Sequence, residues 1–500
     1  MKMEKSPVKS NRNIYLTVFI ANLSFLAVGH GAGWSSPSLP IITSDDFFIK
    51  ISSDQASWVV SYISLGGVFG PLVSGCLLDV IGRKKTITFN MAVNLFSWIF
   101  LWFGSSVEIM YVARFLCGVT IGITFTTVPI YIAEISEPRM RGLLNGLNLV
   151  TRSSTILFQY VAGNLVNYFT LIELSCIVPI LYFLLMFWMP ESPYFLIAKG
   201  KKDEAIKVLT WFRGEVPPNV LEKEIKEIKD YIEKSSSQKG SFKDLFKKEH
   251  YRIILIMFGM LAFSQLIGVT VVLFFLKSIF EASKSTVPSS WASSLVCALM
   301  LVVAFFIPTI SKLFGYKKPM ILSSVGSGVS LAALGGSFFL FDQGIQTPFL
   351  NYTPLISLVV YIIFLSLGML SFPWMVVSEM LPSTIKARAS SIATSVGFLT
   401  AFLSSVTFSS LIESLGIDVS FWLYSVFCFA SAMFIYVFIP ETSGLSLNEI
   451  QDAIKLPQKI NNDKEVNSNK KTMVVCLKNQ FEINIGIDGT YTSKNVNENA

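Results

Sequence analysis

Acidic and basic residues recur in this chain at matched spacing. Glu134 is followed seven residues later by Arg141, and Glu379 is followed seven residues later by Lys386. A carboxylate that meets a guanidinium or an ammonium forms a strong ion pair, which can hold two helices together and release them again. The chemistry that this spacing indicates is reversible ion pairing rather than covalent catalysis.

A second motif repeats at almost the same distance. Residues 190–193 read Pro-Glu-Ser-Pro, and residues 440–443 read Pro-Glu-Thr-Ser. The offset between these motifs is 440 − 190 = 250, and the offset between the two acidic residues of the ion-pair motif is 379 − 134 = 245. The agreement predicts two repeated halves, an architecture that is typical of proteins with a central solute site in the membrane.

Residues for covalent or metal chemistry are few. The chain has two histidines and six cysteines, and no two cysteines form a CxxC pair. Most of the cysteines lie in apolar runs, where a thiol behaves as a small hydrophobic group. No GxxxxGK[ST] loop for a nucleotide is present. We therefore predict no metal, no cofactor, no disulfide framework and no enzyme activity.

The elements that position the charged motifs are predicted to be membrane-spanning helices. Hydrophobic residues make up 52% of the chain and charged residues 15%, with a mean hydropathy of +0.58, whereas a soluble domain carries about 25% charged residues. Twelve apolar runs are each long enough for a spanning helix of about 20 residues. They lie at 14–34, 57–78, 86–105, 109–132, 145–167, 171–189, 252–276, 291–312, 319–341, 353–376, 390–414 and 419–439.

Basic residues in alternate loops set the predicted orientation. Counted from a cytosolic N-terminus, the short inner loops are richer in lysine and arginine than the outer loops, which places both termini in the cytosol. The net charge of +7 follows from this topology, and we expect no nucleic-acid partner. The basic inner-loop residues are Arg83, Lys84, Lys85, Arg139, Arg141, Lys312, Lys317, Lys318, Lys386 and Arg388.

The runs divide the chain into five parts. We expect a cytosolic N-terminus at 1–13, a six-helix bundle at 14–189, a cytosolic helical linker at 190–250, a second six-helix bundle at 251–440, and a cytosolic tail at 441–500 that is disordered after about 457. The predicted fold class is an all-α membrane protein with twelve transmembrane helices in two pseudo-repeats. The first run is too long for a cleavable signal.

Two shorter features fit this topology. Ile225, Ile228 and Ile232 lie at helical spacing among charged residues, so the linker is predicted to hold an amphipathic surface helix. The sequon Asn351-Tyr-Thr353 falls in a predicted outer loop, the correct side for glycosylation at Asn351.

Together, the motifs resemble the sugar porter branch of the major facilitator superfamily over nearly the whole chain, to about Ile450. Trp34 with Ser36-Pro37 is similar to the insect facilitated trehalose transporter-like proteins. The motifs that carry the resemblance are Gly75-x3-Asp79-x2-Gly82-Arg83-Lys84, Pro129-x-Tyr131-x2-Glu134 with Arg141-Gly142, Pro190-Glu191-Ser192-Pro193 and Pro440-Glu441-Thr442. The resemblance implies the major facilitator fold, a sugar as solute, and a monomer in the plasma membrane.

The resemblance also implies a latch of charged residues at the cytosolic helix ends. Such a latch closes the inner side of the protein and breaks when the two bundles rock; the alternative is solvated charge that only sets topology. The implied latch residues are Asp79, Arg83, Glu134, Arg141, Glu191, Glu379, Lys386 and Glu441.

A sugar site needs hydrogen-bonding side chains at mid-membrane and an aromatic face for the ring. Gln265 and Trp374 match the family's sugar-contacting glutamine and tryptophan, while Ser264 and Thr270 replace its further glutamine and its asparagine. A mid-membrane glutamine either binds solute or holds helices together by hydrogen bonds.

Three residues depart from the family's pattern. Leu149 stands where a sugar-contacting glutamine is usual, and Gly397 stands where an asparagine is usual. Arg152 lies about ten residues, or roughly 15 Å, into the fifth run. An intramembrane arginine is a candidate functional residue; the alternatives are a contact with an acidic solute group, a pair with a carboxylate, or a helix-bridging role.

Coupling is predicted from the first run. Proton symporters of the family carry an aspartate there in a Gly-Tyr-Asp string, where this chain has Gly29-His30-Gly31. Without that carboxylate we expect facilitated diffusion rather than proton symport. Two other functions remain open: transport of a non-sugar or anionic solute, and a non-transporting sugar sensor that signals through its tail.

Overall fold

The structure, a computed structural model, describes residues 12–137, 140–214, 217–237, 248–283, 287–345, 347, 350–380 and 386–439. The regular elements of these ranges are all helices. The predicted tail at 441–500 lies outside them. The described residues thus support the predicted all-α class.

The first half of the chain folds into seven α-helices and a short 3-10 helix. They are α1 (Arg12–Gly33), α2 (Ser35–Ile42), α3 (Ser53–Val80), α4 (Arg83–Trp102), α5 (Val107–Ile135), α6 (Arg141–Leu165), α7 (Tyr168–Leu185) and η1 (Met186–Trp188). Three helices follow in the linker, namely α8 (Pro193–Ala198), α9 (Lys202–Arg213) and α10 (Pro218–Ser237).

The second half contains eight further α-helices and one 3-10 helix among the described residues. They are α11 (Lys248–Leu266), α12 (Val269–Ala282), α13 (Ser289–Phe314), α14 (Lys317–Asp342), η3 (Leu350–Tyr352), α15 (Thr353–Leu367), α16 (Phe372–Met380), α17 (Lys386–Leu415) and α18 (Ile417–Phe438).

Ten helical segments of the described residues are long and apolar enough to cross a membrane. Ten of the predicted runs correspond to these segments. The remaining two runs are covered by α4 and α6, which are helical but more polar, because α4 begins with three basic residues and α6 contains Asn148, Arg152 and Gln159.

Two of the predicted runs form broken helices. Gly268 separates α11 from α12 within run 252–276, and residues 368–371 separate α15 from α16 within run 353–376. Gly268 has a φ of +91°, in the left-handed region that glycine reaches without strain. The prediction of one continuous helix for each of these two runs is wrong, because apolar length alone does not report a local change of backbone direction. The first run is continuous in α1, and α2 follows it after Trp34.

Glycines bring α3 and α5 into close contact. A Cβ atom built at Gly66 would lie 1.9 Å from the Phe115 carbonyl oxygen, and one at Gly118 would lie 1.9 Å from that of Ile63. One turn further along, a Cβ atom built at Gly70 would lie 2.6 Å from the Cα atom of Gly122. The two backbones approach so closely that no side chain fits between them.

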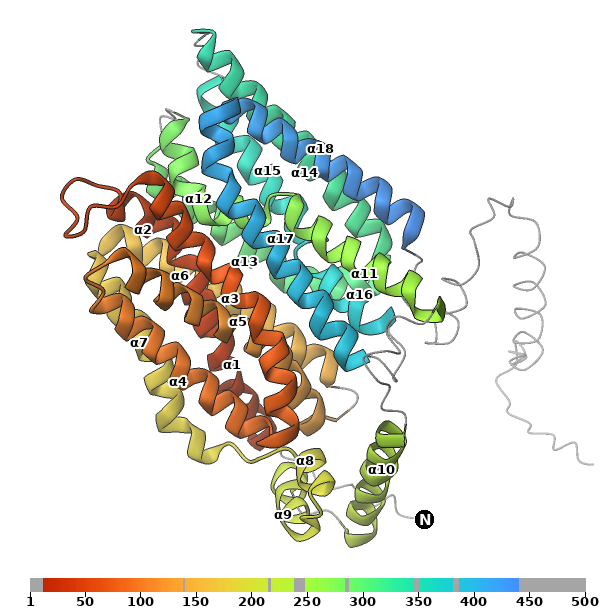
Figure 1. Cartoon of the computed structure of the whole chain (residues 1–500). Coiled ribbons are helices and arrows are strands. Elements are labelled where there is room, and N and C mark those ends of the chain that lie inside the picture. Colours follow the sequence, from red (N-terminus) through yellow and green to blue (C-terminus); the bar gives the residue numbers. More distant parts are fainter. Residues whose placement is uncertain are drawn as a thin grey trace, which may run out of the picture. The chain divides into compact units, whose positions relative to one another are not determined.

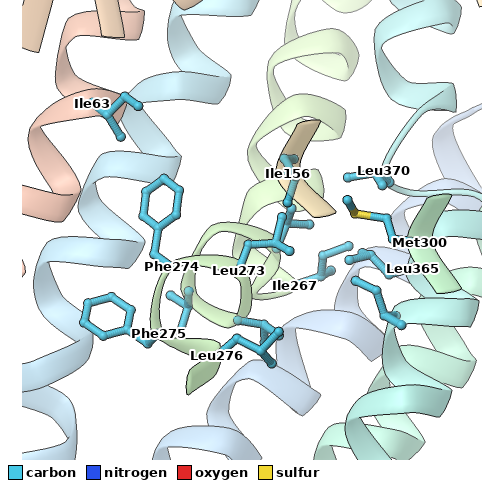
Figure 2. Packing of buried hydrophobic residues seen from close by; sticks show 14 of the residues in the cluster. Ile63, Ile156, Ile267, Leu273, Phe274, Phe275, Leu276, Met300, Leu365 and Leu370 are labelled. Carbon is cyan, nitrogen blue, oxygen red and sulfur yellow. The ribbon is translucent and has the colours of Figure 1, made fainter. Parts of the chain in front are cut away.

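The two halves meet along three pairs of helices. In Figure 1 the first half (red to yellow) and the second half (green to blue) form two groups of helices, and α3 packs on α17, α6 on α13, and α2 on α12. Figure 2 shows Leu273 and Phe274 of α12 near Ile63 of α3 and Ile156 of α6, which belong to the first half. The boundary between the halves is therefore a buried apolar surface.

Hydrogen bonds cross the same boundary. Asn164 of α6 donates to the Ser290 carbonyl oxygen at 2.9 Å and to the Ser294 hydroxyl at 3.1 Å. The hydroxyls of Ser57 on α3 and Ser409 on α17 lie 2.5 Å apart. These residues lie near the helix ends that the predicted topology places outside the cell.

Candidate functional site

A cavity of about 90 Å³ lies between the two halves. Phe125 of α5 and Arg152 of α6 line it from the first half, and Gln265, Thr270 and Trp374 line it from the second. Cavities that enclose small ligands usually measure about 300–1,000 Å³. A solute the size of a sugar therefore requires the halves to move apart from the arrangement seen here.

The broken helix α11–α12 presents the polar part of this cavity. Gln265 lies at the end of α11 and Thr270 at the start of α12, and the left-handed turn at Gly268 between them lets the Thr270 hydroxyl donate to Gln265 Oε1 at 3.0 Å. Gln265 Nε2 donates to Ser264 Oγ at 3.3 Å. Gln265 is thus oriented by two neighbours and still faces the cavity.

Ser264 differs from its neighbour. Its side chain is fully buried, its hydroxyl donates to the Leu261 carbonyl oxygen at 2.7 Å, and it does not line the cavity. The bond to the preceding turn occupies the hydroxyl within its own helix. The structure brings Gln265, Thr270 and Trp374 together as predicted and places Ser264 behind them.

Three aromatic rings form the other wall of the cavity. The Trp374 ring centroid lies 5.6 Å from that of Phe125 and 6.0 Å from that of Phe398, and Phe125 and Phe398 are 6.2 Å apart. Phe125 belongs to the first half and the other two to the second, so the cluster bridges both. The sequence does not predict a role for Phe125, because nothing distinguishes it among 42 phenylalanines.

Of the remaining predicted solute residues, one lines the cavity and two do not. Arg152 lines the cavity, and its guanidinium carbon lies 5.8 Å from the Phe125 ring centroid. Leu149 is half-buried outside the lining. Gly397 also lies outside it, but a Cβ there would sit 3.4 Å from the Trp374 ring, so the glycine leaves room for that ring.

Charged residues of the predicted latch meet at the end of the first half that the predicted topology places in the cytosol. Arg83 of α4 pairs with Glu134 of α5 at 2.7 Å, and both side chains are mostly buried. Glu134 also accepts a hydrogen bond from the Ser192 hydroxyl. Glu191 accepts from the backbone amides of Arg83 and Lys84 at 2.9 and 3.1 Å. These bonds join α4, α5 and the segment before α8, all within one half.

The structure describes the other predicted latch residues only in part. Arg141 donates to the Ser136 carbonyl oxygen at 3.3 Å and to the Tyr194 hydroxyl. Burial raises the pKa of the Tyr194 phenol, and the nearby Arg141 partly offsets this rise. Asp79 is exposed at the end of α3. The side chains of Glu379 and Lys386 and the whole of Glu441 lie outside the described residues, so the second copy of the latch stays a prediction.

The linker helices dock on the first half through a residue that the sequence analysis did not select. Arg213 of α9 donates to the Ile135 carbonyl oxygen at the end of α5 at 2.9 Å and pairs with Glu224 of α10 at 2.7 Å. Asn13 of α1 donates to the Trp211 carbonyl oxygen at 2.7 Å. Ile225 and Ile228 of α10 are buried as the predicted amphipathic face.

A fully buried guanidinium, that of Arg114, lies in the first half. Arg114 of α5 donates to the Gly31 carbonyl oxygen at 2.9 Å and to the Ser35 hydroxyl at 2.6 Å, and its guanidinium carbon stacks 4.7 Å from the Trp34 ring. These contacts hold the break between α1 and α2. Trp34 was recognised in the sequence, but its partner was not, because the two lie far apart along the chain.

The predicted glycosylation site lies at the start of a spanning segment. Asn351 is half-buried in η3, immediately before α15. Its position agrees with a short loop, and its modification stays a prediction.

The helical halves, the cavity between them and the ten apolar segments define a membrane transporter of the major facilitator fold. The fold is similar to the inward-open xylose transporter XylE from E. coli, with a TM-score of 0.75 and 19% identity over 88% of this chain and 99% of that chain. It is also similar to the proton:xylose symporter XylE bound to 6-bromo-6-deoxy-D-glucose, with a TM-score of 0.72 and 21% identity over 88% and 99% of the two chains.

Residues 16–454 match the family model described as Sugar (and other) transporter. The facilitated trehalose transporter Tret1 of Bombyx mori is 31% identical over 438 residues, which cover 87% of this chain and 86% of that protein. Tret1 of Culex quinquefasciatus is 29% identical over 452 residues, or 90% and 87% of the two chains. The chain belongs to the sugar transporter family, and the predictions of a sugar porter and of a non-enzyme are confirmed.

Proposed function

We propose that the protein carries a sugar, trehalose or a hexose, across the plasma membrane by alternating access. The observation that carries this proposal is the cavity between the halves, where Gln265 and Thr270 offer hydrogen bonds and Trp374 offers an aromatic face. Sugars present hydroxyl groups at their edges and apolar C–H faces, which these two kinds of side chain complement. The name of the Bombyx mori relative supports trehalose.

In this proposal α4 and α6 also span the membrane, which gives twelve spans in two halves of six with both termini cytosolic. Each of these helices packs along apolar neighbours, α4 on α5 and α6 on α1 and α13. Their polar side chains then face protein, where an intramembrane polar group is tolerated. The Arg83–Glu134 pair braces the cytosolic helix ends of the first half, and its predicted counterpart does the same in the second half. The protein functions as a monomer.

We propose facilitated diffusion as the mode of transport. His30 stands where proton symporters of the family have an aspartate, and it does not line the cavity. Its ring nitrogen Nδ1 is held in a buried network with Gln159 and Ser175 of the first half. In the arrangement that the structure describes, His30 is buried away from the cavity, which supports a structural role for it.

Initial-rate uptake into proteoliposomes tests this function. We expect saturable uptake of labelled trehalose or glucose that does not change when a protonophore collapses a proton gradient. Uptake that accelerates with an inward proton gradient and stops with the protonophore contradicts facilitated diffusion. Absence of uptake for every sugar, despite measurable sugar binding, contradicts transport and favours a sensor.

A further inference from the structure

Arg152 places a positive charge at the wall of the central cavity. It extends from α6 beside Gln265, Thr270 and Trp374, and its described contact is the face of Phe125 at 5.8 Å. The residues that line the cavity include no aspartate or glutamate. Among the described residues, the ion pairs involve Arg83, Lys201, Arg213 and Lys229 but not Arg152.

A guanidinium that lines a membrane cavity without a carboxylate beside it is a candidate functional group. Arg152 is half-buried, and its side chain borders the cavity. A contact with an aromatic face is weaker than an ion pair with a charge-assisted hydrogen bond. The contact with Phe125 therefore leaves the N–H donors of Arg152 available to a solute within the described part of the chain.

Arg114 shows how the same protein satisfies a guanidinium that serves packing. Arg114 lies closer to its aromatic partner, at 4.7 Å, and has a backbone carbonyl and a hydroxyl as hydrogen-bond acceptors. It also lies away from the cavity lining. Arg152 has no such acceptors in the ranges that the structure describes and faces the cavity, so its donors are directed where a solute enters.

The groups around Arg152 restrict what that solute is. Gln265, Thr270 and Trp374 suit the hydroxyls and the apolar face of a sugar ring. A guanidinium presents two parallel N–H donors that match the two oxygens of a carboxylate or a phosphate. The two features in one cavity fit a sugar that bears an anionic group.

We propose that the cavity accepts an acidic sugar, with Arg152 pairing to its carboxylate or phosphate group while Gln265 and Trp374 hold the ring. This inference rests on the proposed function of sugar transport and extends its substrate class to sugars that carry an anionic group. Because Arg152 stays with the protein while the solute crosses, transport of such a sugar carries net negative charge across the membrane.

Proteoliposome uptake and current measurements test the inference with defined probes. Labelled glucuronate represents a carboxylate, glucose 6-phosphate represents a phosphate, and glucose and trehalose represent neutral sugars. We expect the unaltered protein to take up at least one acidic probe, faster when the inside of the vesicle is positive. The probe that is transported distinguishes a carboxylate from a phosphate.

Substitutions then assign the effect to Arg152. Arg152→Gln is expected to lower uptake of the acidic sugar by about tenfold or more relative to uptake of neutral sugars, the loss of one charge-assisted contact. Arg152→Lys keeps the charge and is expected to retain part of the uptake. Lys312→Gln removes an exposed positive charge at the end of α13 and serves as the matched control.

The outcomes separate the inference from the proposed function. Uptake of neutral sugars only, with no uptake of either acidic probe by the unaltered protein, overturns the inference and leaves sugar transport intact. Equal loss of acidic and neutral uptake in Arg152→Gln assigns Arg152 to structure and also overturns it. Absence of all sugar uptake defeats the proposed function itself.

Discussion

Gln265 and Ser264 are neighbours in the chain and have different environments. Gln265 is fixed by Thr270 and Ser264 and lines the cavity, whereas the Ser264 hydroxyl donates to the backbone of its own helix. Sequence likeness selected both as solute residues. Only the glutamine lines the cavity, because the Ser264 hydroxyl points to the Leu261 carbonyl oxygen one turn earlier in α11.

This difference gives a matched pair of substitutions. We expect Gln265→Ala to raise the KM for sugar about tenfold or more, because a lost hydrogen bond in a cavity costs about 1–3 kcal/mol. Ser264→Ala is expected to change it less than about threefold, since the serine bonds only within the protein. Initial-rate kinetics in proteoliposomes measure both. Equal effects of the two substitutions contradict the assignment of Gln265 as the solute contact.

At the scale of helices, the close crossing of α3 and α5 depends on glycines, which have no side chain. At Gly66 and at Gly118, an added methyl carbon would lie only 1.9 Å from a carbonyl oxygen of the other helix. No rotamer change relieves a contact with backbone, so a larger residue must push the helices apart.

Gly118→Ala is therefore expected to destabilise the protein by about 1–3 kcal/mol or more, the usual cost of overpacking a well-packed interface. Gly336→Ala, within α14 and with no atom within 4 Å of the new methyl group, is the control and is expected to be neutral. Thermal unfolding in detergent, followed by size-exclusion chromatography, reports both. An unchanged melting temperature for Gly118→Ala contradicts the close crossing.

Helices also show how far the sequence predicts the structure. The runs of apolar residues predict the spanning helices, since the length of an apolar run determines whether it can cross the membrane. The breaks at Gly268 and 368–371 were not predicted, because apolar composition continues across them. The pairs Arg114–Trp34 and Phe125–Trp374 were missed because their partners lie far apart in the sequence.

At the scale of the molecule, alternating access requires the two halves to separate at each end in turn. Ser57 and Ser409 join α3 and α17 near their predicted outer ends, with 2.5 Å between the hydroxyl oxygens. Bonds from Asn164 to Ser290 and Ser294 join α6 and α13 at the same level. The arrangement seen here is thus closed on the predicted outer side.

A disulfide at this contact tests that motion. The double substitution Ser57→Cys with Ser409→Cys places two sulfurs where the hydroxyls meet, close to the bond length of about 2 Å that a disulfide needs. We expect oxidation to stop uptake and reduction to restore it, because the outer ends can no longer part. Each single substitution serves as a control. Undiminished uptake by the cross-linked protein, with the disulfide verified by mass spectrometry, contradicts alternating access at this boundary.

We propose that a sugar crosses between the halves through the cavity lined by Gln265 and Trp374. Counterflow tests this path most directly: proteoliposomes are loaded with unlabelled sugar, labelled sugar is added outside, and its internal concentration is followed in time. We expect a transient accumulation of label above the outside concentration, which is abolished in Trp374→Ala. Simple equilibration without that overshoot, or an overshoot that Trp374→Ala leaves unchanged, contradicts it.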